Sequence, residues 1–155
     1  MELIETATGN KVEAIIEPVL LGDYKIIKKS KRFPDFNWDK EKRNEVLKIR
    51  LRDSDEILGL MSLVDFKPEF WIKINLLQSS VGNIGADKEY DRIAGCLIAH
   101  ACKEAFKRGY FGCVALEPKT ELADYYREKY GMEGRGIHLS TELKNSQDII
   151  TEYLS

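Results

Sequence analysis

Hydrophobic and polar residues alternate along the segment between residues 45 and 78. In residues 47–52, leucine and isoleucine alternate with lysine and arginine, which predicts a strand with one solvent-exposed face. The segment Ile57–Val64 predicts a second strand, joined to the first through the polar turn DSDE as a hairpin. A third strand is predicted for Trp71–Gln78, where isoleucine and leucine recur at every second position.

A long amphipathic helix is predicted between Asp91 and Arg108. Its hydrophobic residues are spaced three and four apart and form one stripe: Ile93, Leu97, Ile98, Ala101, Cys102, Ala105 and Phe106. Lysine and arginine in the last turn suit the negative end of the helix dipole, and Gly109 provides a left-handed stop.

The C-terminal third alternates between short strands and helices. We predict a strand at Gly112–Leu116, a helix at Thr120–Tyr130 capped by Thr120, a strand at Ile137–Leu139 and a helix at Ser146–Leu154. The whole order predicts a mixed α/β fold, with an antiparallel meander followed by a β-α-β unit. A ligand in such a sheet is expected at the carboxyl ends of the strands, near the entrance to the long helix.

The first forty residues carry a weaker pattern. Val12–Leu21 and Tyr24–Ile27 have the hydrophobic content of strands. Lys28–Arg43 mixes basic and acidic residues with a proline and aromatic residues. One interpretation is a loop or short helix that turns its aromatic side chains inward, and the other is a flap over a substrate site. The aromatic residues are Phe33, Phe36 and Trp38.

Length and charge narrow the classes of function. The 155 residues suffice for one domain, which we expect to span residues 1–155. Acidic residues outnumber basic ones by 26 to 24, which disfavours a general nucleic-acid binder. No hydrophobic run approaches the length of a membrane span, and the N-terminal MELIETATGNK has no signal-peptide pattern. We therefore expect a cytoplasmic protein without a membrane partner.

The cysteines and histidines form no recognisable metal site. Cys96, Cys102 and Cys113 are odd in number and match no zinc spacing, so we interpret them as buried hydrophobic residues in a reducing compartment. Neither His100 nor His138 has a cysteine or aspartate at metal-ligand spacing. We therefore expect no metal.

Small residues mark the entrance to the long helix, at Ile93-Ala94-Gly95. The first backbone N–H groups of a helix have no intrahelical acceptor and carry partial positive charge, so they suit a phosphate. Small side chains let a ligand approach this backbone closely. The same residues would also suit close packing against a neighbouring element, and the pattern alone leaves both interpretations open.

Three stretches of the sequence resemble the GNAT superfamily of acyl-CoA-dependent N-acyltransferases. WIKINLLQSS is similar to the fourth strand of that family, KEYDRIAGCLIAHACKEAFKRGY to its pyrophosphate loop and central helix, and VALEPKTELADYYREKYGM to its fifth strand and following helix. The resemblance covers residues 45–132, with a weaker fit to Leu139. It implies an α/β (α+β) fold with a mixed, mostly antiparallel central sheet, splayed middle strands and helices on both faces.

The loop motif of the family, Q/R-x-x-G-x-G/A, fits this sequence in two placements. With the helix register held fixed, Glu89 takes the first position, Arg92 the first glycine and Ala94 the last position. If Arg92 instead begins the motif, Gly95 takes the first glycine and Leu97 the last position. We prefer the first placement because it keeps the helix register. The resemblance implies that the pyrophosphate of acetyl-CoA binds the amides of Arg92, Ile93, Ala94 and Gly95.

The resemblance also implies roles for residues outside the loop. Lys119 stands where the family often has an asparagine, and its charge suits a phosphate. Tyr126 aligns with the tyrosine that protonates the leaving thiolate, a role that suits a neutral phenol with a reference pKa of about 10. Without the resemblance, Tyr126 is interpreted as a core aromatic residue. Glu117, at the end of the predicted fifth strand, is a candidate general base, with a water chain as the alternative. The strand edge that binds the pantetheine arm corresponds to Leu77, Gln78 and Ser79.

Three functions are compatible with these observations. The first is an N-acetyltransferase that transfers an acetyl group from acetyl-CoA to a small-molecule or protein amine by direct attack. The second is a GNAT-like domain that binds acyl-CoA without catalysis or has lost the cofactor. The third, a toxin-like acetyltransferase of charged tRNA, is disfavoured by the negative net charge. The basic residues that would contact tRNA are Lys28, Lys29, Lys31 and Arg32. For any of the three functions, a homodimer is compatible with such a fold.

Overall fold

The structure, a computed structural model, describes the backbone of residues 1–155 and the side chains of all of them except Arg135. The strands are β1 (Glu2–Glu5), β2 (Lys11–Pro18), β3 (Glu45–Leu51), β4 (Gly59–Phe66), β5 (Trp71–Ser79), β6 (Tyr90–Asp91), β7 (Val114–Leu116), β8 (Glu133–Arg135) and β9 (His138–Thr141). The described backbone forms one sheet in the order β6-β1-β2-β3-β4-β5-β7-β9-β8. Neighbouring strands are antiparallel except β5 and β7, which run parallel. The predicted mixed, mostly antiparallel sheet is confirmed.

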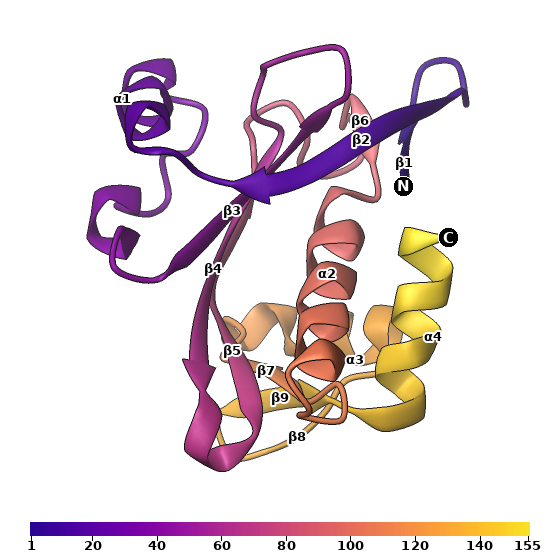
Figure 1. Cartoon of the computed structure of the whole chain (residues 1–155). Coiled ribbons are helices and arrows are strands. Elements are labelled where there is room, and N and C mark those ends of the chain that lie inside the picture. The colour runs from indigo at the N-terminus through magenta and orange to yellow at the C-terminus, as the bar shows by residue number, and fades with distance from the viewer.

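Helices pack around this sheet (Figure 1). The α-helices are α1 (Leu21–Ser30), α2 (Ile93–Lys107), α3 (Ala123–Tyr130) and α4 (Leu143–Leu154), and the short 3₁₀ helices are η1 (Trp38–Glu41), η2 (Lys67–Glu69) and η3 (Thr120–Leu122). Helices α2 and α4 lie side by side in Figure 1 and contact each other along their length. Of the helices in the described residues, none is long and apolar enough to cross a membrane.

Hydrophobic residues pack on both faces of the sheet. On one face Ile49 of β3 belongs to the main core, which includes Leu97 and the other buried residues of α2. Val46 lies three positions before Ile49, so its side chain points to the opposite face. There it packs with Ile27 of α1 and Trp38 of η1 in a smaller core. Helices therefore cover both faces, as predicted.

The segment Tyr24–Ile27, predicted as a strand, belongs to helix α1, so that prediction is wrong. Tyr24 and Ile27 are three residues apart, a spacing at which a helix places both side chains on one face, and both are buried. Asp23 stabilises the start of the helix because its carboxylate accepts the backbone N–H of Leu20 at 2.8 Å.

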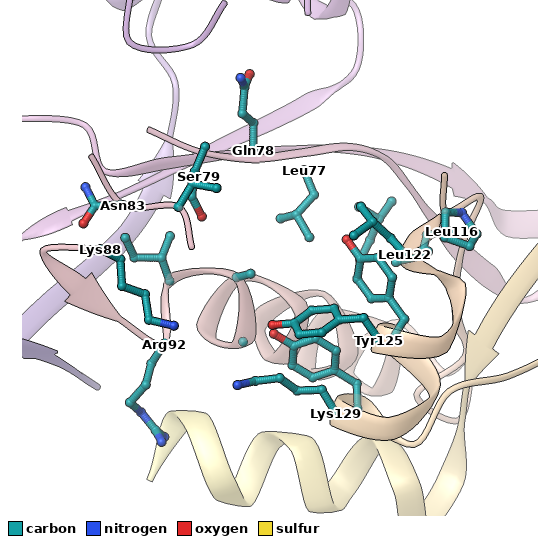
Figure 2. A pocket seen from close by; sticks show the side chains of 18 of the residues that line it. Leu77, Gln78, Ser79, Asn83, Lys88, Arg92, Leu116, Leu122, Tyr125 and Lys129 are labelled. Atoms are coloured by element: carbon teal, nitrogen blue, oxygen red, sulfur yellow. The ribbon is translucent and has the colours of Figure 1, made fainter. Parts of the chain in front are cut away.

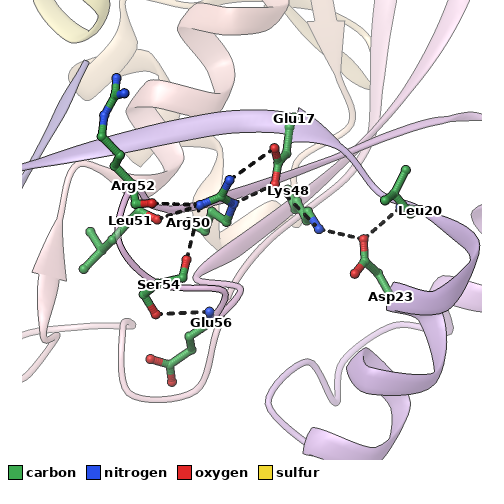
Figure 3. A network of polar contacts seen from close by, with 9 residues as sticks. All are labelled: Glu17, Leu20, Asp23, Lys48, Arg50, Leu51, Arg52, Ser54 and Glu56. Atoms are coloured by element: carbon green, nitrogen blue, oxygen red, sulfur yellow. Dashed lines mark hydrogen bonds and ion pairs between the residues drawn. The ribbon is translucent and has the colours of Figure 1, made fainter.

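A network of charges attaches α1 to the sheet (Figure 3). The Asp23 carboxylate lies 2.7 Å from Lys48 Nζ of β3, and Lys48 lies 3.7 Å from Glu17 of β2. Glu17 in turn accepts a hydrogen bond of 2.6 Å from Arg50. The side chain of Lys48 is only 10% exposed, so its charge requires these partners. The network holds α1 over one face of the sheet.

The other differences from the sequence prediction concern short elements. Strands β1, β6 and β8 have too few residues to show a pattern. Both residues of β6 are paired with β1, Tyr90 with Glu5 and Asp91 with Ile4. Thr120 is not the cap of the following α-helix. It begins η3, and α3 starts at Ala123, because a 3₁₀ turn precedes the α-helix.

Strands β5 and β7 separate in the middle of the sheet. They pair only from Ile72 to Ile74 on β5, opposite residues 114–116 of β7. Strand β5 then continues to Ser79 with β4 as its neighbour on one side. A register shift leaves Asn75 out of the β4–β5 ladder as a bulge. The predicted splay is confirmed, and Asn75 is the residue at which it opens.

Candidate active site

A cavity of about 930 Å³ lies where β5 and β7 separate, beside the first turn of α2 (Figure 2). Its walls come from β5, the loop before α2, the segment after β7, and helices α3 and α4. It brings together the site residues predicted from the sequence, whose individual roles stay predictions. Among the described side chains, no group of three metal-binding residues occurs. The predicted residues that line the cavity are Leu77, Gln78, Ser79, Arg92, Ile93, Ala94, Gly95, Glu117, Lys119 and Tyr126.

The N-terminus of α2 presents backbone donors to the cavity. The N–H of Cys96 donates to the carbonyl of Arg92 at 2.9 Å, which is the first hydrogen bond of the helix. The N–H groups of Ile93, Ala94 and Gly95 come before that bond, so no earlier helical turn supplies them with acceptors. These donors and the positive end of the helix dipole make this end of the cavity suited to an anion.

The edge of β5 presents a second set of backbone groups. The N–H of Ser80 donates to the carbonyl of Leu58 at 2.9 Å, on the β4 side. Because backbone groups alternate along a strand, those of Gln78 also face β4, whereas those of Leu77 and Ser79 face the open side. The side chains of Leu77 and Gln78 point to opposite sides of β5 (Figure 2), and Gln78 Oε1 accepts the indole N–H of Trp38 at 3.0 Å. Of the three residues predicted for this edge, two therefore face the splay with their backbone.

Tyr126 lies on α3, between the core and the cavity. It packs against the main core, and its ring centroid lies 5.8 Å from that of Tyr125 and 6.0 Å from that of Tyr130. Burial, and to a smaller degree the neighbouring Tyr125, raises the pKa of Tyr126 above its ordinary value. The phenol is therefore protonated at neutral pH, the state that a proton donor needs. Both interpretations of Tyr126 fit, because the residue packs in the core and also lines the cavity.

Glu117 follows β7 and carries a negative charge. Its carboxylate lies 3.1 Å from Lys73 Nζ and 3.3 Å from His138 Nε2. The hydrogen bond from Lys73, with the charges of both neighbours, lowers the pKa of Glu117. A lowered pKa makes a carboxylate a weaker base, so these contacts favour a role in charge recognition over proton abstraction.

Comparisons with known proteins identify the fold. No family model matches the sequence, and no curated protein matches it. Among solved structures, 41 chains match. One is a GNAT family acetyltransferase from Elizabethkingia anophelis with acetyl-CoA bound, with a TM-score of 0.61 over 84% of this chain and 99% of that chain, at 15% identity. The chain has the GNAT fold.

Two further structures with the GNAT fold name an acceptor or a product. A spermidine N-acetyltransferase chimera from Vibrio cholerae SpeG and hSSAT matches with a TM-score of 0.62 over 92% of this chain and 99% of that chain, at 12% identity. AtaT complexed with acetyl-methionyl-tRNAfMet matches with a TM-score of 0.55 over 90% of this chain and 99% of that chain, at 13% identity. At these identities the likeness establishes the fold alone.

The preferred placement of the loop motif assigns Arg92 to the first loop glycine, and this placement stays a prediction. The φ of Arg92, 81°, lies in the left-handed region that favours glycine. The guanidinium group points away from the cavity toward α4 (Figure 2), where it lies 4.6 Å from the ring centroid of Tyr153 and donates a hydrogen bond to the carbonyl of Glu152. Arg92 therefore contributes its backbone to the loop, while its charge is used in packing against α4.

Gly95 has a packing role in this GNAT fold. A Cβ atom at this position would lie 2.1 Å from Cε1 of Tyr153, so α4 approaches the helix entrance as closely as a glycine allows. Ala94, in contrast, is half-buried and lines the cavity. Of the two interpretations of the small-residue turn, packing explains Gly95, and close ligand approach stays a prediction for Ala94.

Two lysines in the cavity were missed by the sequence analysis. Lys88 lies in the loop before α2 and Lys129 on α3, and both project toward the helix N-terminus in Figure 2. Lys88 Nζ lies 3.0 Å from Asp91 Oδ1, which also accepts the N–H of Arg92 at 2.8 Å. Burial alone would raise the pKa of Asp91, but these two hydrogen bonds and the charge of Lys129 lower it. The sequence did contain one indication for Lys129: it lies three residues after Tyr126, a spacing that places both side chains on one face of a helix.

The segment Lys28–Arg43 combines both interpretations made from the sequence. Phe33 and Trp38 are buried, so its aromatic side chains turn inward as predicted. Asp35 and Phe36 line the cavity, as a flap would. Of the basic residues considered for tRNA contact, Arg32 forms an ion pair with Glu56.

Proposed function

We propose that this protein is an N-acetyltransferase that transfers an acetyl group from acetyl-CoA to an amine by direct attack. The observation that carries the proposal is the cavity at the splay of β5 and β7, with the N-terminus of α2 at one end. In a GNAT fold, this arrangement places phosphate-binding donors and an open strand edge on the two sides of one groove.

The residues present fit acetyl-CoA, which supplies an activated thioester when bound. The amides of Arg92 to Gly95, together with the ammonium groups of Lys88 and Lys129, would hold the phosphates. The exposed Lys119 would add a further positive charge at the same cavity. The backbone of Leu77 and Ser79 would pair with the amides of the pantetheine arm as a neighbouring strand does.

The reaction requires one proton donor and a neutral amine. The nitrogen of the acceptor forms a bond to the thioester carbonyl carbon, and the carbon–sulfur bond breaks. The phenol of Tyr126 gives its proton to the leaving thiolate, and the proton lost by the amine passes to water. The raised pKa of Tyr126 keeps the phenol protonated until the thiolate appears.

An amine acceptor agrees with the charge around the splay. Asp35 and Glu117 line the cavity, and Glu117 is held as a charged carboxylate by Lys73. A cationic amine is attracted to such a wall. The fold neighbours that name spermidine and acetyl-methionyl-tRNA act on amines, which supports an amine acceptor in general. The proposal covers a small-molecule or protein amine.

Calorimetric titration with acetyl-CoA and CoA tests the cofactor part of the proposal. We expect micromolar binding that weakens about tenfold in Ala94→Val, since the larger side chain obstructs approach to the backbone donors. Ala7→Val is the matched control, because Ala7 is exposed in the β1–β2 turn. Absence of binding at millimolar ligand would refute the proposal.

Substitution of Tyr126 tests the chemistry separately. We expect Tyr126→Phe to lower kcat by roughly a hundredfold with an accepted amine, because the thiolate loses its proton donor. The affinity for CoA should not change, since the ring still packs against Tyr125 and Tyr130. An unchanged kcat would remove Tyr126 from the mechanism.

A further inference from the structure

The acceptor side of the splay contains two neighbouring polar residues. The last cross-strand pair between β5 and β7 is Ile74 with Leu116. The next residues along each strand are Asn75 and Glu117, and both line the cavity. Glu117 pairs with Lys73, which lies on the sheet face opposite the core residues Ile72 and Ile74. Asn75 and Glu117 therefore lie on the same face of the sheet, the face turned away from α2.

Glu41 is a buried carboxylate directly behind Asn75. It lies in η1 and is only 8% exposed. Its Oε1 atom accepts hydrogen bonds from Asn75 Nδ2 at 2.7 Å and from Asn44 Nδ2 at 3.3 Å. Among the described side chains, no cationic group forms an ion pair with Glu41. A carboxylate is seldom buried without a counter-charge, so this placement requires a reason.

The contact with Glu41 fixes the orientation of the Asn75 amide. A carboxylate only accepts hydrogen bonds, so the NH₂ group of Asn75 must face Glu41. The carbonyl oxygen Oδ1 is then the atom of this amide left for a ligand, at an exposed residue of the cavity wall. The bulge places this residue at the opening of the splay, where the thioester carbonyl would lie in the proposed function.

We infer that Asn75 Oδ1, oriented by Glu41, binds the amino group of the acceptor, and that the acceptor is a cationic amine whose charge faces Glu117. The inference rests on the proposed function and specifies its substrate class. Asn75 Oδ1 accepts one N–H of the bound ammonium group and so orients its nitrogen, while Glu117 supplies the charge complement. The ammonium group then loses a proton to water, and the neutral nitrogen attacks. Glu41 does not line the cavity and is therefore a positioning residue.

The test uses the full chain saturated with CoA, with n-butylamine as the probe and n-butanol as its uncharged match. In isotope-labelled protein, the side-chain amide resonance of Asn75 is identified by its absence in Asn75→Leu. We expect n-butylamine to shift this resonance in a saturable manner and n-butanol to leave it unchanged. An equal shift with both probes would overturn the inference, because it would show that the charge is not recognised.

Variants of Glu41 separate positioning from general stability. We expect Glu41→Met to weaken n-butylamine binding about tenfold, because the Asn75 amide loses its fixed partner. Glu41→Gln should restore binding, since its amide oxygen accepts the same hydrogen bond. Asn44→Ala is the matched control, because Asn44 contacts Glu41 without lining the cavity. Equal n-butylamine affinity in Glu41→Met and the wild type would overturn the inference.

Two further measurements keep the outcomes distinct. If Glu41→Met does not fold, calorimetric titration of Asn75→Leu with n-butylamine decides, and retained wild-type affinity overturns the inference. The CoA affinity of each protein is measured in parallel. CoA binding by the wild type without n-butylamine binding overturns this inference alone, whereas absence of CoA binding overturns the proposed function and the inference together.

Discussion

The two ends of helix α2 are built in opposite ways. At the C-terminal end, the protein itself satisfies the last carbonyl groups: the N–H of Gly109 binds Phe106 at 3.1 Å and that of Tyr110 binds Ala105 at 2.8 Å. At the N-terminal end, the N–H groups of residues 93–95 face the cavity. Each end also has a nearby residue with a positive φ, 81° at Arg92 and 55° at Phe111. Backbone strain is therefore common to both ends, and what distinguishes them is whether the chain caps its own backbone.

The charged side chains at the two ends of α2 also differ in their partners. At the C-terminal end, Arg108 forms ion pairs with Glu45 at 2.7 Å and Asp65 at 3.0 Å, and the Tyr110 hydroxyl donates to Asp65 at 2.8 Å. At the N-terminal end, Lys88 and Lys129 project into the cavity (Figure 2). The charges at the C-terminal end bind one another, whereas at the N-terminal end Lys88 pairs with Asp91 and both lysines still line the cavity. Variants at the two ends should therefore change stability and cofactor affinity to different extents.

The largest effect is expected at Gly95, where α4 packs against the N-terminal end of α2. Gly95→Ala would place a methyl group against the Tyr153 ring, at a Cβ distance of 2.1 Å, so we expect the free energy of unfolding to fall by about 2–3 kcal/mol. Urea denaturation measures it. Gly22→Ala is the control, since Gly22 lies in α1 with nothing near its Cβ position, and it should gain up to about 1 kcal/mol. Unchanged stability in Gly95→Ala would show that α4 does not restrict this end.

The next largest effect is expected at the C-terminal end of α2, where the chain caps its own carbonyl groups. Arg108→Met removes both ion pairs of a guanidinium group that is 24% exposed, so we expect a loss of about 1–2 kcal/mol in the free energy of unfolding. The affinity for CoA should stay at the wild-type value. Lys107→Met is the matched control, because Lys107 is 65% exposed and should change stability by less than about 0.5 kcal/mol. Equal losses in the two variants would mean that the Arg108 network does not stabilise the fold.

A smaller effect is expected from the titration of Asp91, beside the N-terminal end of α2. The folded protein lowers the pKa of Asp91 from its ordinary value of 3.8, so the charged form stabilises the fold above that pH. This contribution is lost as the pH falls through the lowered pKa. Asp91→Asn should therefore be less stable than the wild type at neutral pH, by less than about 1 kcal/mol, and equally stable in strong acid. Urea denaturation across this range measures it, and a difference that persists in strong acid would contradict the assignment.

Regular elements were predictable because their patterns are long. The helix predicted for Asp91–Arg108 is observed as Ile93–Lys107, and the strand predicted for Trp71–Gln78 ends one residue later. In α1, the hydrophobic residues Tyr24, Ile26 and Ile27 include both a spacing of two, which fits a strand, and a spacing of three, which fits a helix, so the short run is ambiguous. The ion pair of Asp23 with Lys48 attaches this helix to the sheet, and a local pattern does not contain such a contact.

The residues of the candidate site also differ in whether the sequence could predict their positions. The predicted order of elements placed a ligand at the entrance to the long helix, where residues 92–95 line the cavity, whereas residues 77–79 were assigned by the resemblance to the GNAT superfamily. The pair of Glu41 and Asn75 is separated by 34 residues, and no local pattern in the sequence relates the two. Gly95 shows the reverse case, because its place in the loop was predictable but its contact with Tyr153 of α4 was not.

The smallest effect, and the sharpest test of the comparison, is the removal of a side chain from each strained residue. Phe111 is 67% exposed, so Phe111→Gly relieves its left-handed backbone at little loss of packing, and we expect a gain of roughly 0.5 kcal/mol. Arg92→Gly relieves the same strain but loses the contact of the guanidinium group with Tyr153, worth about 0.5–1 kcal/mol, so no net gain is expected. Urea denaturation of both variants measures the difference. Equal gains would show that the Arg92 side chain contributes nothing at α4, and the N-terminal end of α2 would then be held by Gly95 packing alone.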